Sequence, residues 1–372
     1  MNRKLELDAL RGLLLVLMTL THLPTRLSVY SSQVFGFVSA AEGFVFLSAF
    51  LTGAIYARKL AGGQHRAVRS SLLLRARRLY LWHLGLLLFA FTVIAAIGVY
   101  GQRPALYNLL DFYFAQPAVA LWAAPLLVYQ PPLLDILPMY IVFVIATPWL
   151  LGAAQREGWT RLLWLSALVW LFAQLRGRSL LLAAFNAATG THVPTIPEQA
   201  LGTFDWFAWQ LLWTAGLWIG AAGSDPRQHA ALRLSPLMRG AALVCALAFL
   251  AWYHGIGGIW PDRVQPLLFG KTLLRPLRIV DFAMLAISGA WLAPMLFRGL
   301  RCFALLGRAS LSVFTMHLLL VLLSLGLIVS DDTPLDSWQE SLVLVATFTS
   351  LLLTAWRHRQ RQRRPAAVNA GE

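Results

Sequence analysis

The sequence predicts an all-α polytopic integral membrane protein, a bundle of about ten transmembrane helices with both termini in the cytoplasm. Three observations predict this fold class. Hydrophobic residues make up 58% of the 372 positions and charged residues only 13%, whereas soluble domains carry about 25% charged residues. Several apolar stretches reach the roughly 20 residues that span a bilayer. The charged residues gather between these stretches rather than within them.

Ten apolar stretches are assigned as spans in chain order. They are residues 9–28, 35–57, 79–100, 133–152, 161–178, 206–223, 238–255, 276–297, 308–329 and 338–356. The segment 104–130 is moderately apolar, but Pro104, Pro117 and Pro125 interrupt it. Because prolines end helices, we interpret it as a re-entrant or interfacial piece. If it crossed the membrane fully, every later span would reverse its direction.

The distribution of basic residues supports this topology. With the N-terminus inside, most of the 31 Lys and Arg residues fall in the predicted cytoplasmic segments, as the positive-inside rule requires. A formal net charge of +15 would also suit nucleic-acid binding, but the position of the charges between spans argues against it. Residues 1–356 are predicted to form a single transmembrane domain, and residues 357–372 a disordered, basic cytoplasmic tail.

The first span carries Arg11 and His22 on one helix face. Eleven residues at about 100° each bring His22 back to the side of Arg11, about 16.5 Å further along the helix, and Asp8 lies near the same stripe. Ionisable residues in hydrocarbon are expensive and usually face a functional cavity. The span therefore indicates a membrane-embedded catalyst or carrier. The alternative for Arg11 is that it snorkels to the inner surface with Asp8 as its partner.

The second span adds Glu42. By helix rise, Glu42 and His22 both lie about 9–10 Å below the outer boundary, since each is some six to seven residues inside its span. The connection 28–34 is short, so the two spans are expected to be antiparallel neighbours. A carboxylate beside an imidazole orients the ring and raises its basicity, as a general base requires. The alternative is a buried His–Glu pair that only ties two helices together.

Arginines open the third span on its predicted cytoplasmic side. Arg75 and Arg78 are three residues apart and share a helix face, so they are suited to hold phosphate groups. The alternative is an ordinary positive-inside anchor. His83 lies further into the span, where it either lines the same cavity or hydrogen-bonds within the bundle.

Polar residues near the predicted outer surface are candidates for an acceptor or acyl site. Asp135 opens the fourth span, although an acid is also favourable at any helix N-terminus. Trp209 and Gln210 begin the sixth span, where exposed aromatics could stack on sugar rings or form an aromatic belt. Lys271 and Arg278 precede and open the eighth span, where they could attract an anionic acyl group or polymer, or form a salt-bridged loop.

The remaining patterns argue against other chemistry. His317, in the ninth span, is interpreted as structural. The sequence contains no HExxH, no G-x-S-x-G and no phosphate-cradling glycine loop, and no metal-ligand spacing. We therefore expect no metal and no permanently bound cofactor.

Through the ordered set of these residues, the chain resembles the osmoregulated periplasmic glucan succinyltransferase (OpgC) family. That family is related to transmembrane acyltransferases of the acyltransferase-3 type. The matching segments extend from residue 5 to about residue 320, so the resemblance covers most of the chain. They are Leu7–Gly12, His22–Pro24, Phe35–Phe37, Ala40–Ser48, Arg75 with Arg78, Leu79–His83, Asp135–Tyr140, Phe207–Gln210, Lys271–Arg278 and Leu306–Arg308.

The resemblance implies a multi-pass enzyme of the bacterial inner membrane. Such an enzyme moves an acyl group from cytoplasmic acyl-CoA to a hydroxyl of a periplasmic glycan, with succinyl as the family default and acetyl left open. Arg75 and Arg78 would hold the CoA phosphates, and Arg11 would lie along the pantetheine arm. His22, oriented by Glu42, would activate the sugar hydroxyl for direct attack or would itself carry the acyl group. The expected partners are acyl-CoA, the glycan acceptor and the lipid bilayer.

Two other functions remain open from the sequence. The first is a proton-coupled carrier or lipid-linked glycan translocase, in which His22 and Glu42 would form a proton relay. The second is a scaffold that has lost its chemistry, which would tolerate His22→Ala. A requirement for acyl-CoA separates the acyltransferase from both. The sequence indicates neither the glycan nor the oligomeric state.

Overall fold

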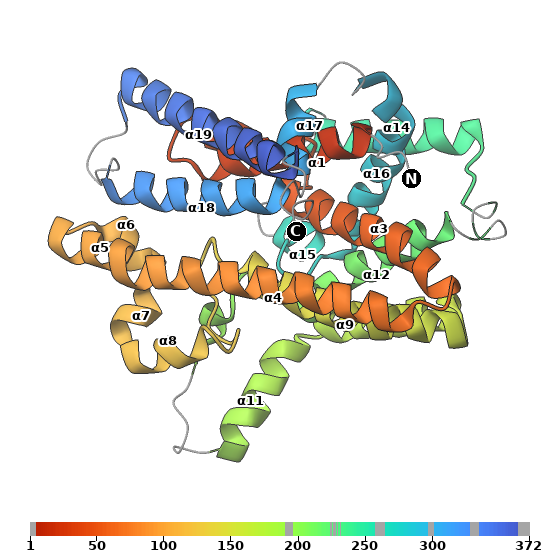
Figure 1. Ribbon diagram of the computed structural model, residues 1–372, viewed down its shortest axis with the longest axis horizontal. Helices are drawn as coiled ribbons and strands as arrows, with labels where there is room; N and C mark the ends of the chain where they lie inside the picture. Colours follow the sequence, from red (N-terminus) through yellow and green to blue (C-terminus); the bar gives the residue numbers. More distant parts are fainter. Residues whose placement is uncertain are drawn as a thin grey trace, which may run out of the picture. The chain divides into compact units, whose positions relative to one another are not determined.

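A computed structural model describes residues 5–189, 196–223, 225, 228, 230, 232–256, 265–296, 301–327 and 335–363. Throughout these ranges the regular secondary structure is helical (Figure 1). The all-α prediction is therefore confirmed for the described part of the chain.

Seven of the described helices are long and apolar enough to cross a membrane. They are Ala40–Ala61 (α3), His65–Gly101 (α4 to α5), Ile136–Glu157 (α9), Pro236–Tyr253 (α14), Pro276–Ala293 (within α16), Ser310–Leu327 (α18) and Ser337–Gln362 (within α19). A further candidate is the pair Trp159–Gln174 (α10) and Gly177–Ala188 (within α11), which bends by 68° at its break. A multi-pass membrane protein is thus supported, while ten spans with both termini inside stay a prediction.

The first span has different bounds from those predicted. The sequence predicts residues 9–28, but α1 runs from Leu5 to His22. The residue before a proline is disfavoured in a helix. Leu23 precedes Pro24, so the helix stops at His22. His22 therefore lies at the end of α1 rather than some six residues inside it. The short helix α2 (Leu27–Ser31) follows.

The third span begins earlier than predicted. The sequence predicts residues 79–100, but α4 begins at His65 and runs to Phe89, then continues through a π-helical turn (Ala90–Ile94) into α5 (Ala95–Gly101). Hydropathy detects only the apolar part of a helix. The preceding basic stretch continues the helix because arginine has a high helix propensity.

The segment 104–130 is interrupted, as its prolines predict. It contains three short helices, α6 (Pro104–Leu109), α7 (Asp111–Ala115) and α8 (Pro117–Ala123). Two of them begin at a proline, which is favourable at the first helical position. None approaches the roughly 20 residues of a complete span. The interruption is therefore confirmed, and the re-entrant or interfacial position of the segment stays a prediction.

The C-terminal segment is more ordered than predicted. The helix α19 runs from Ser337 to Arg363, so residues 357–363 are helical and not a disordered tail. Arginine and glutamine dominate this stretch, and both residues favour helix. Residues 364–372 lie outside the described residues.

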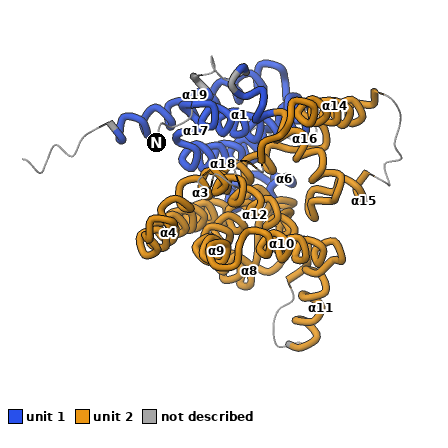
Figure 2. The backbone as a smooth tube through the Cα atoms, turned by 90° about the vertical axis from the view of Figure 1, so that its right-hand side faces the viewer, with its two compact units in different colours: residues 1–34, 93–106, 289–372 blue, residues 35–92, 107–288 orange. Residues whose placement is uncertain are grey.

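The chain divides into two compact units (Figure 2). Unit 1 comprises residues 1–34, 93–106 and 289–372, and holds α1, α2, α5, α17 (Arg301–Arg308), α18 and α19. Unit 2 comprises residues 35–92 and 107–288. It holds α3, α4, α9, α10, α11 (Gly177–Thr189), α12 (Trp206–Ala222), α14, α15 (Gln265–Phe269) and most of α16 (Pro276–Leu296).

Two glycines bring α1 and α17 together in unit 1. A Cβ added at Gly12 would overlap the backbone carbonyl of Phe303, and one added at Gly307 would overlap the backbone carbonyl of Asp8. Small residues of this kind let helix backbones approach closely in membrane proteins. Gly12 is thus a point of close approach between two helix backbones.

Unit 2 is built around an equally close contact between α3 and α12. Gly216 and Gly220, four residues apart on α12, lie against the backbone of Phe46 and Phe50, and Gly53 lies against that of Leu217. This spacing is the G-x-x-x-G pattern of closely packed membrane helices.

We predict that Gly12→Ala destabilises the protein. The new methyl group has no room beside the Phe303 carbonyl, and overpacking costs about 1–3 kcal/mol. A thermal-unfolding scan of the purified protein in nanodiscs should show a lower Tm. Gly85→Ala is the matched control, since a Cβ at Gly85, also inside a helix, has nothing within 4 Å. Equal melting temperatures for the two variants would contradict the close α1–α17 packing.

Candidate active site

Two polar contacts join α1 to α18 inside unit 1. Arg11 Nη2 donates to Ser310 Oγ at 2.6 Å, and His22 Nδ1 lies 3.4 Å from His317 Nε2. Residue numbers increase on both helices from the first contact to the second, so α1 and α18 run side by side in the same direction. Arg11 and His22 thus share the face predicted for them, and that face contacts α18.

The ring nitrogens of the two histidines form an ordered chain. His317 Nδ1 lies 2.7 Å from the backbone carbonyl of Phe314. A carbonyl can only accept, so the proton of this bond belongs to His317 Nδ1. In neutral His317, Nε2 is then an acceptor, and His22 Nδ1 donates to it. This tautomer leaves the lone pair of His22 on Nε2.

The two histidines differ in exposure. The rings are stacked with an interplanar angle of 15° and their centroids 5.7 Å apart. His317 is fully buried in α18, whereas His22 is only partly buried at the end of α1. The arrangement suits a buried imidazole that orients a more accessible one. Interpreting His317 as merely structural therefore overlooked its contact with His22.

Asp8 contacts a basic residue of another helix. Its Oδ2 lies 3.2 Å from Arg308 Nε at the end of α17. The sequence proposes Arg11 as the partner of Asp8, one helical turn away. The close α1–α17 packing brings Arg308 within reach of the same carboxylate.

Glu42 is held by two partners within unit 2. Its Oε1 accepts a hydrogen bond from Arg278 Nε at 2.5 Å, and the pair is buried. Its Oε2 accepts from the backbone nitrogen and the hydroxyl of Ser39, at 3.0 and 2.5 Å. Glu42 thus belongs to a capping box at the start of α3. His22 belongs to unit 1, and the predicted His22–Glu42 pair stays a prediction.

The position of Glu42 along its helix could be predicted only in part from the sequence. The second span was predicted from residue 35, with Glu42 about seven residues inside it, but α3 begins at Ala40 and Glu42 is its third residue. The pattern Ser39-Ala-Ala-Glu42 is that of a capping box, and it marks this start. Nothing in the sequence indicates that Arg278, which is 236 residues away, is the partner of Glu42.

Residues of α16 secure the chain on both sides of Ser39. Asp281 Oδ2 accepts from the backbone nitrogen of Phe37 at 3.0 Å, while Arg278, almost one helical turn earlier, binds Glu42. Arg278 Nη1 also donates to the carbonyl of Phe269 at 3.0 Å. Of the two roles considered for Arg278, the structure therefore favours the salt bridge.

Asp135 and Lys271 lie around the start of α12. Asp135 is buried, and its Oδ2 accepts from the backbone nitrogen of Thr203 at 2.9 Å. It makes no side-chain cap of its own helix. Lys271 Nζ lies 5.3 Å from the ring centroid of Phe204. Burial raises the pKa of Asp135, although the bonds to Thr203 and the charge of Lys271 act in the opposite direction.

Trp209 and Gln210 hold helices together. Trp209 is fully buried, and its Nε1 donates to the carbonyls of Lys271 and Thr272. The expectation of an exposed aromatic ring at this position is therefore wrong. Gln210 binds Ser166 of α10 twice, through its Oε1 at 2.7 Å and its Nε2 at 2.8 Å. Both side chains satisfy buried polar groups, as a packed bundle requires.

The three residues predicted near the start of the third span lie in different environments. Arg75 Nη1 donates to Thr52 Oγ1 of α3 at 2.8 Å. Arg78 is exposed, and His83 is fully buried. Arg78 is thus the more accessible member of the arginine pair. Among the described residues, no group of three His, Cys, Asp or Glu side chains is arranged to hold a metal ion.

The sequence model of a family described as OpgC protein matches residues 3–363, nearly the whole chain. No curated protein and no solved structure matches.

We predict that Glu42→Gln destabilises unit 2. The substitution removes the carboxylate that pairs directly with the buried Arg278, and breaking a buried ion pair typically costs about 3–5 kcal/mol. The double variant Glu42→Gln/Arg278→Met removes both charges and should recover most of the lost thermal stability in the same unfolding scan. A single variant as stable as the wild type would contradict the buried ion pair.

We predict a pH-dependent difference between the wild type and Asp135→Asn. A pKa raised above the ordinary 3.8 means that folded Asp135 binds its proton more tightly than unfolded Asp135. The wild type should therefore lose stability as pH rises through the raised pKa. Asn keeps an acceptor for Thr203 but cannot ionise. The Tm of the variant minus that of the wild type should increase from about pH 4 to about pH 8, and a constant difference would exclude the effect.

Proposed function

The chain belongs to the OpgC protein family, and we propose that it is a membrane-bound O-acyltransferase of the bacterial inner membrane. It would move an acyl group from cytoplasmic acyl-CoA to a hydroxyl of a periplasmic glucan or related glycan. Succinyl is the donor group that the family suggests, and acetyl is the second donor to test.

The contact between His22 and His317 carries the proposal. A general base must present a lone pair to the hydroxyl that it deprotonates. The Phe314 carbonyl, His317 and His22 are hydrogen-bonded in sequence, which directs the lone pair of His22 to Nε2. A neighbour that fixes the tautomer and orientation of a catalytic imidazole is a general feature of such sites.

The proposed reaction is direct transfer with His22 as the base. His22 Nε2 takes the proton of the glycan hydroxyl while its oxygen attacks the carbonyl carbon of the thioester. A C–O bond forms, the C–S bond breaks, and the CoA thiolate then receives the proton from His22. The alternative is a two-step route in which His22 first carries the acyl group.

The remaining candidate residues have proposed supporting roles. Arg11, hydrogen-bonded to Ser310, lies on the His22 face of α1 and is proposed to contact the pantetheine arm, with Asp8 and Arg308 at the same end of the helix. Exposed Arg78, with Arg75, is proposed to bind donor phosphates, and His83 to line the donor site.

On the acceptor side, Lys271 and Asp135 are the proposed contacts. Three further residues hold helices together and are proposed to position these two contacts: Trp209, Gln210 and Arg278. Glu42 is proposed as a positioning residue through its bond to Arg278, and its pairing with His22 is tested separately.

We predict that His22→Ala abolishes acyl transfer. Removing a general base typically costs 10²-fold or more. The assay offers radiolabelled succinyl-CoA or acetyl-CoA and a β-glucan to purified protein in nanodiscs, and measures label in the glycan. His254→Ala is the matched control, since His254 is exposed at the end of α14. Transfer retained in His22→Ala would refute the role of His22, and a function independent of acyl-CoA would favour a carrier.

The role of His317 is tested by rescue. His317→Ala should lower kcat by about 10²-fold through misplacement of the base, with little change in KM for acyl-CoA. His317→Gln keeps an acceptor for His22 Nδ1–H and should recover part of the rate. A purely structural role for His317 would change protein yield but leave the kcat and pH–rate profile of the folded fraction unaltered.

A further inference from the structure

Unit 1 contains a basic pocket, and Arg308 is the only one of its lining residues that has a role in the proposed function. It has a volume of about 400 Å³ and is lined by Leu305, Arg308, Ala309, Ala355, His358, Arg359 and Gln362. Small-molecule sites commonly measure about 300–1,000 Å³. The lining comes from α19 and from the junction of α17 and α18.

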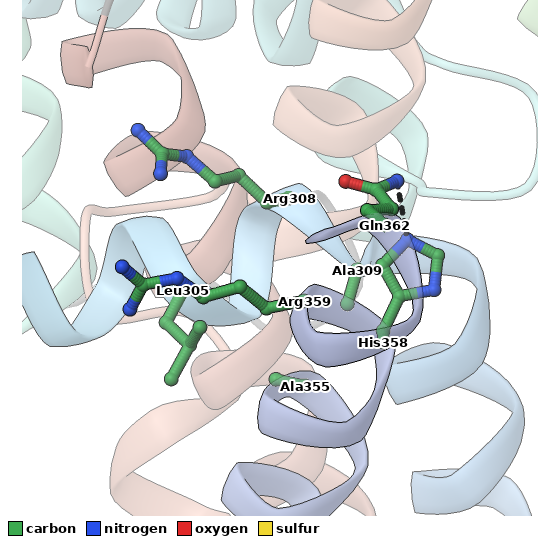
Figure 3. Close-up of a pocket in the computed structure, with 7 residues that line it drawn as sticks. All are labelled: Leu305, Arg308, Ala309, Ala355, His358, Arg359 and Gln362. Atoms are coloured by element: carbon green, nitrogen blue, oxygen red, sulfur yellow. Dashed lines mark hydrogen bonds between the residues drawn. The ribbon is translucent and has the colours of Figure 1, made fainter. Parts of the chain in front are cut away.

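The side chains that line the pocket include two cationic groups and no acidic group. Arg308 and Arg359 extend their guanidinium groups to the same side, while His358 and Gln362 lie on the other, their Nε2 atoms 3.0 Å apart (Figure 3). From residue 341 to residue 363 the chain contains no Asp or Glu. Asp8 pairs with Arg308 and offsets only part of the positive charge.

Two guanidinium groups beside one small cavity favour an anion with several oxygens. Like charges repel unless a counter-charge lies between them, and the planar guanidinium matches the oxygens of phosphate. We infer that this pocket binds a phosphate group. Two sources have this chemistry: the nucleotide end of CoA and the headgroup of an anionic phospholipid.

The order of contacts along unit 1 fits the nucleotide. Arg308 and Ala309 of the pocket immediately precede Ser310, which binds Arg11, and His317 follows about 10.5 Å further along α18 by helix rise. A donor whose phosphates occupy the pocket would direct its arm along α1 and α18 towards His22. This assignment to the donor rests on the proposed function and is an alternative to phosphate binding by Arg75 and Arg78. The phosphate site itself does not depend on the proposed function.

The test measures the binding of 3′,5′-ADP, the phosphate-bearing end of CoA, to full-length protein in phosphatidylcholine nanodiscs. Arg359→Ala should weaken binding by about tenfold or more, the usual effect of losing a charge-assisted hydrogen bond. Arg361→Ala is the matched control, because it removes the same charge two residues further on, away from the pocket face of α19. Arg359→Gln provides a second variant of similar size.

A parallel arm counts phosphatidylglycerol molecules that stay bound to each variant by native mass spectrometry. Loss of 3′,5′-ADP binding in the Arg359 variants alone supports the nucleotide. Loss of bound phosphatidylglycerol in those variants alone, with 3′,5′-ADP binding unaffected, supports the lipid headgroup. Equal behaviour of the Arg359 and Arg361 variants towards both ligands overturns the site.

The acyl-transfer assay separates this result from the proposed function. A wild type that binds phosphate in the pocket but transfers no acyl group would refute the function and leave the site standing. A wild type that transfers an acyl group, with the Arg359 and Arg361 variants binding equally, would refute the site and leave the function standing.

Discussion

The contact between His22 Nδ1 and His317 Nε2 imposes the strictest requirement on unit 1. A 3.4 Å separation requires that α1 and α18 keep one register, and together with the Arg11–Ser310 bond it requires that they run in the same direction. Gly12 and Gly307 supply part of that constraint, because they set α1 against α17, and α18 begins two residues after α17 ends. The Arg11–Ser310 bond then fixes the other end of the interface. Close packing of backbones and pairing of polar groups thus act together.

In unit 2, too, polar side chains pair with one another between helices. A polar group inside an apolar bundle is costly unless it is hydrogen-bonded. Glu42 and Arg278 satisfy one another, Asp281 binds the backbone of Phe37, and Gln210 binds Ser166. Many of the polar residues that look catalytic in the sequence therefore hold helices together. A residue suited to chemistry differs in being both oriented and partly exposed, as His22 is.

The sequence predicted the helical class, the interrupted segment 104–130 and the shared face of Arg11 and His22, because hydropathy and helical period depend on local residues. It did not indicate the Asp8–Arg308, Glu42–Arg278 and His22–His317 contacts, since the two residues of each pair are more than 200 positions apart and a single sequence contains no signal of such contacts. Helix ends were misplaced where the apolar stretch continues beyond the end of the helix, as at Pro24. They were also misplaced where basic residues extend it, as in α4 and α19.

The most direct measurement of the central claim is the ¹⁵N chemical shift of the ring nitrogens of His22 in full-length, histidine-labelled protein. Spectra of His22→Gln and His317→Gln assign the two rings among the 8 histidines of the chain. The account predicts a neutral His22 with its proton on Nδ1 and its lone pair on Nε2. A His22 that carries its proton on Nε2 would contradict the account, because the base would then face His317 instead of the acceptor.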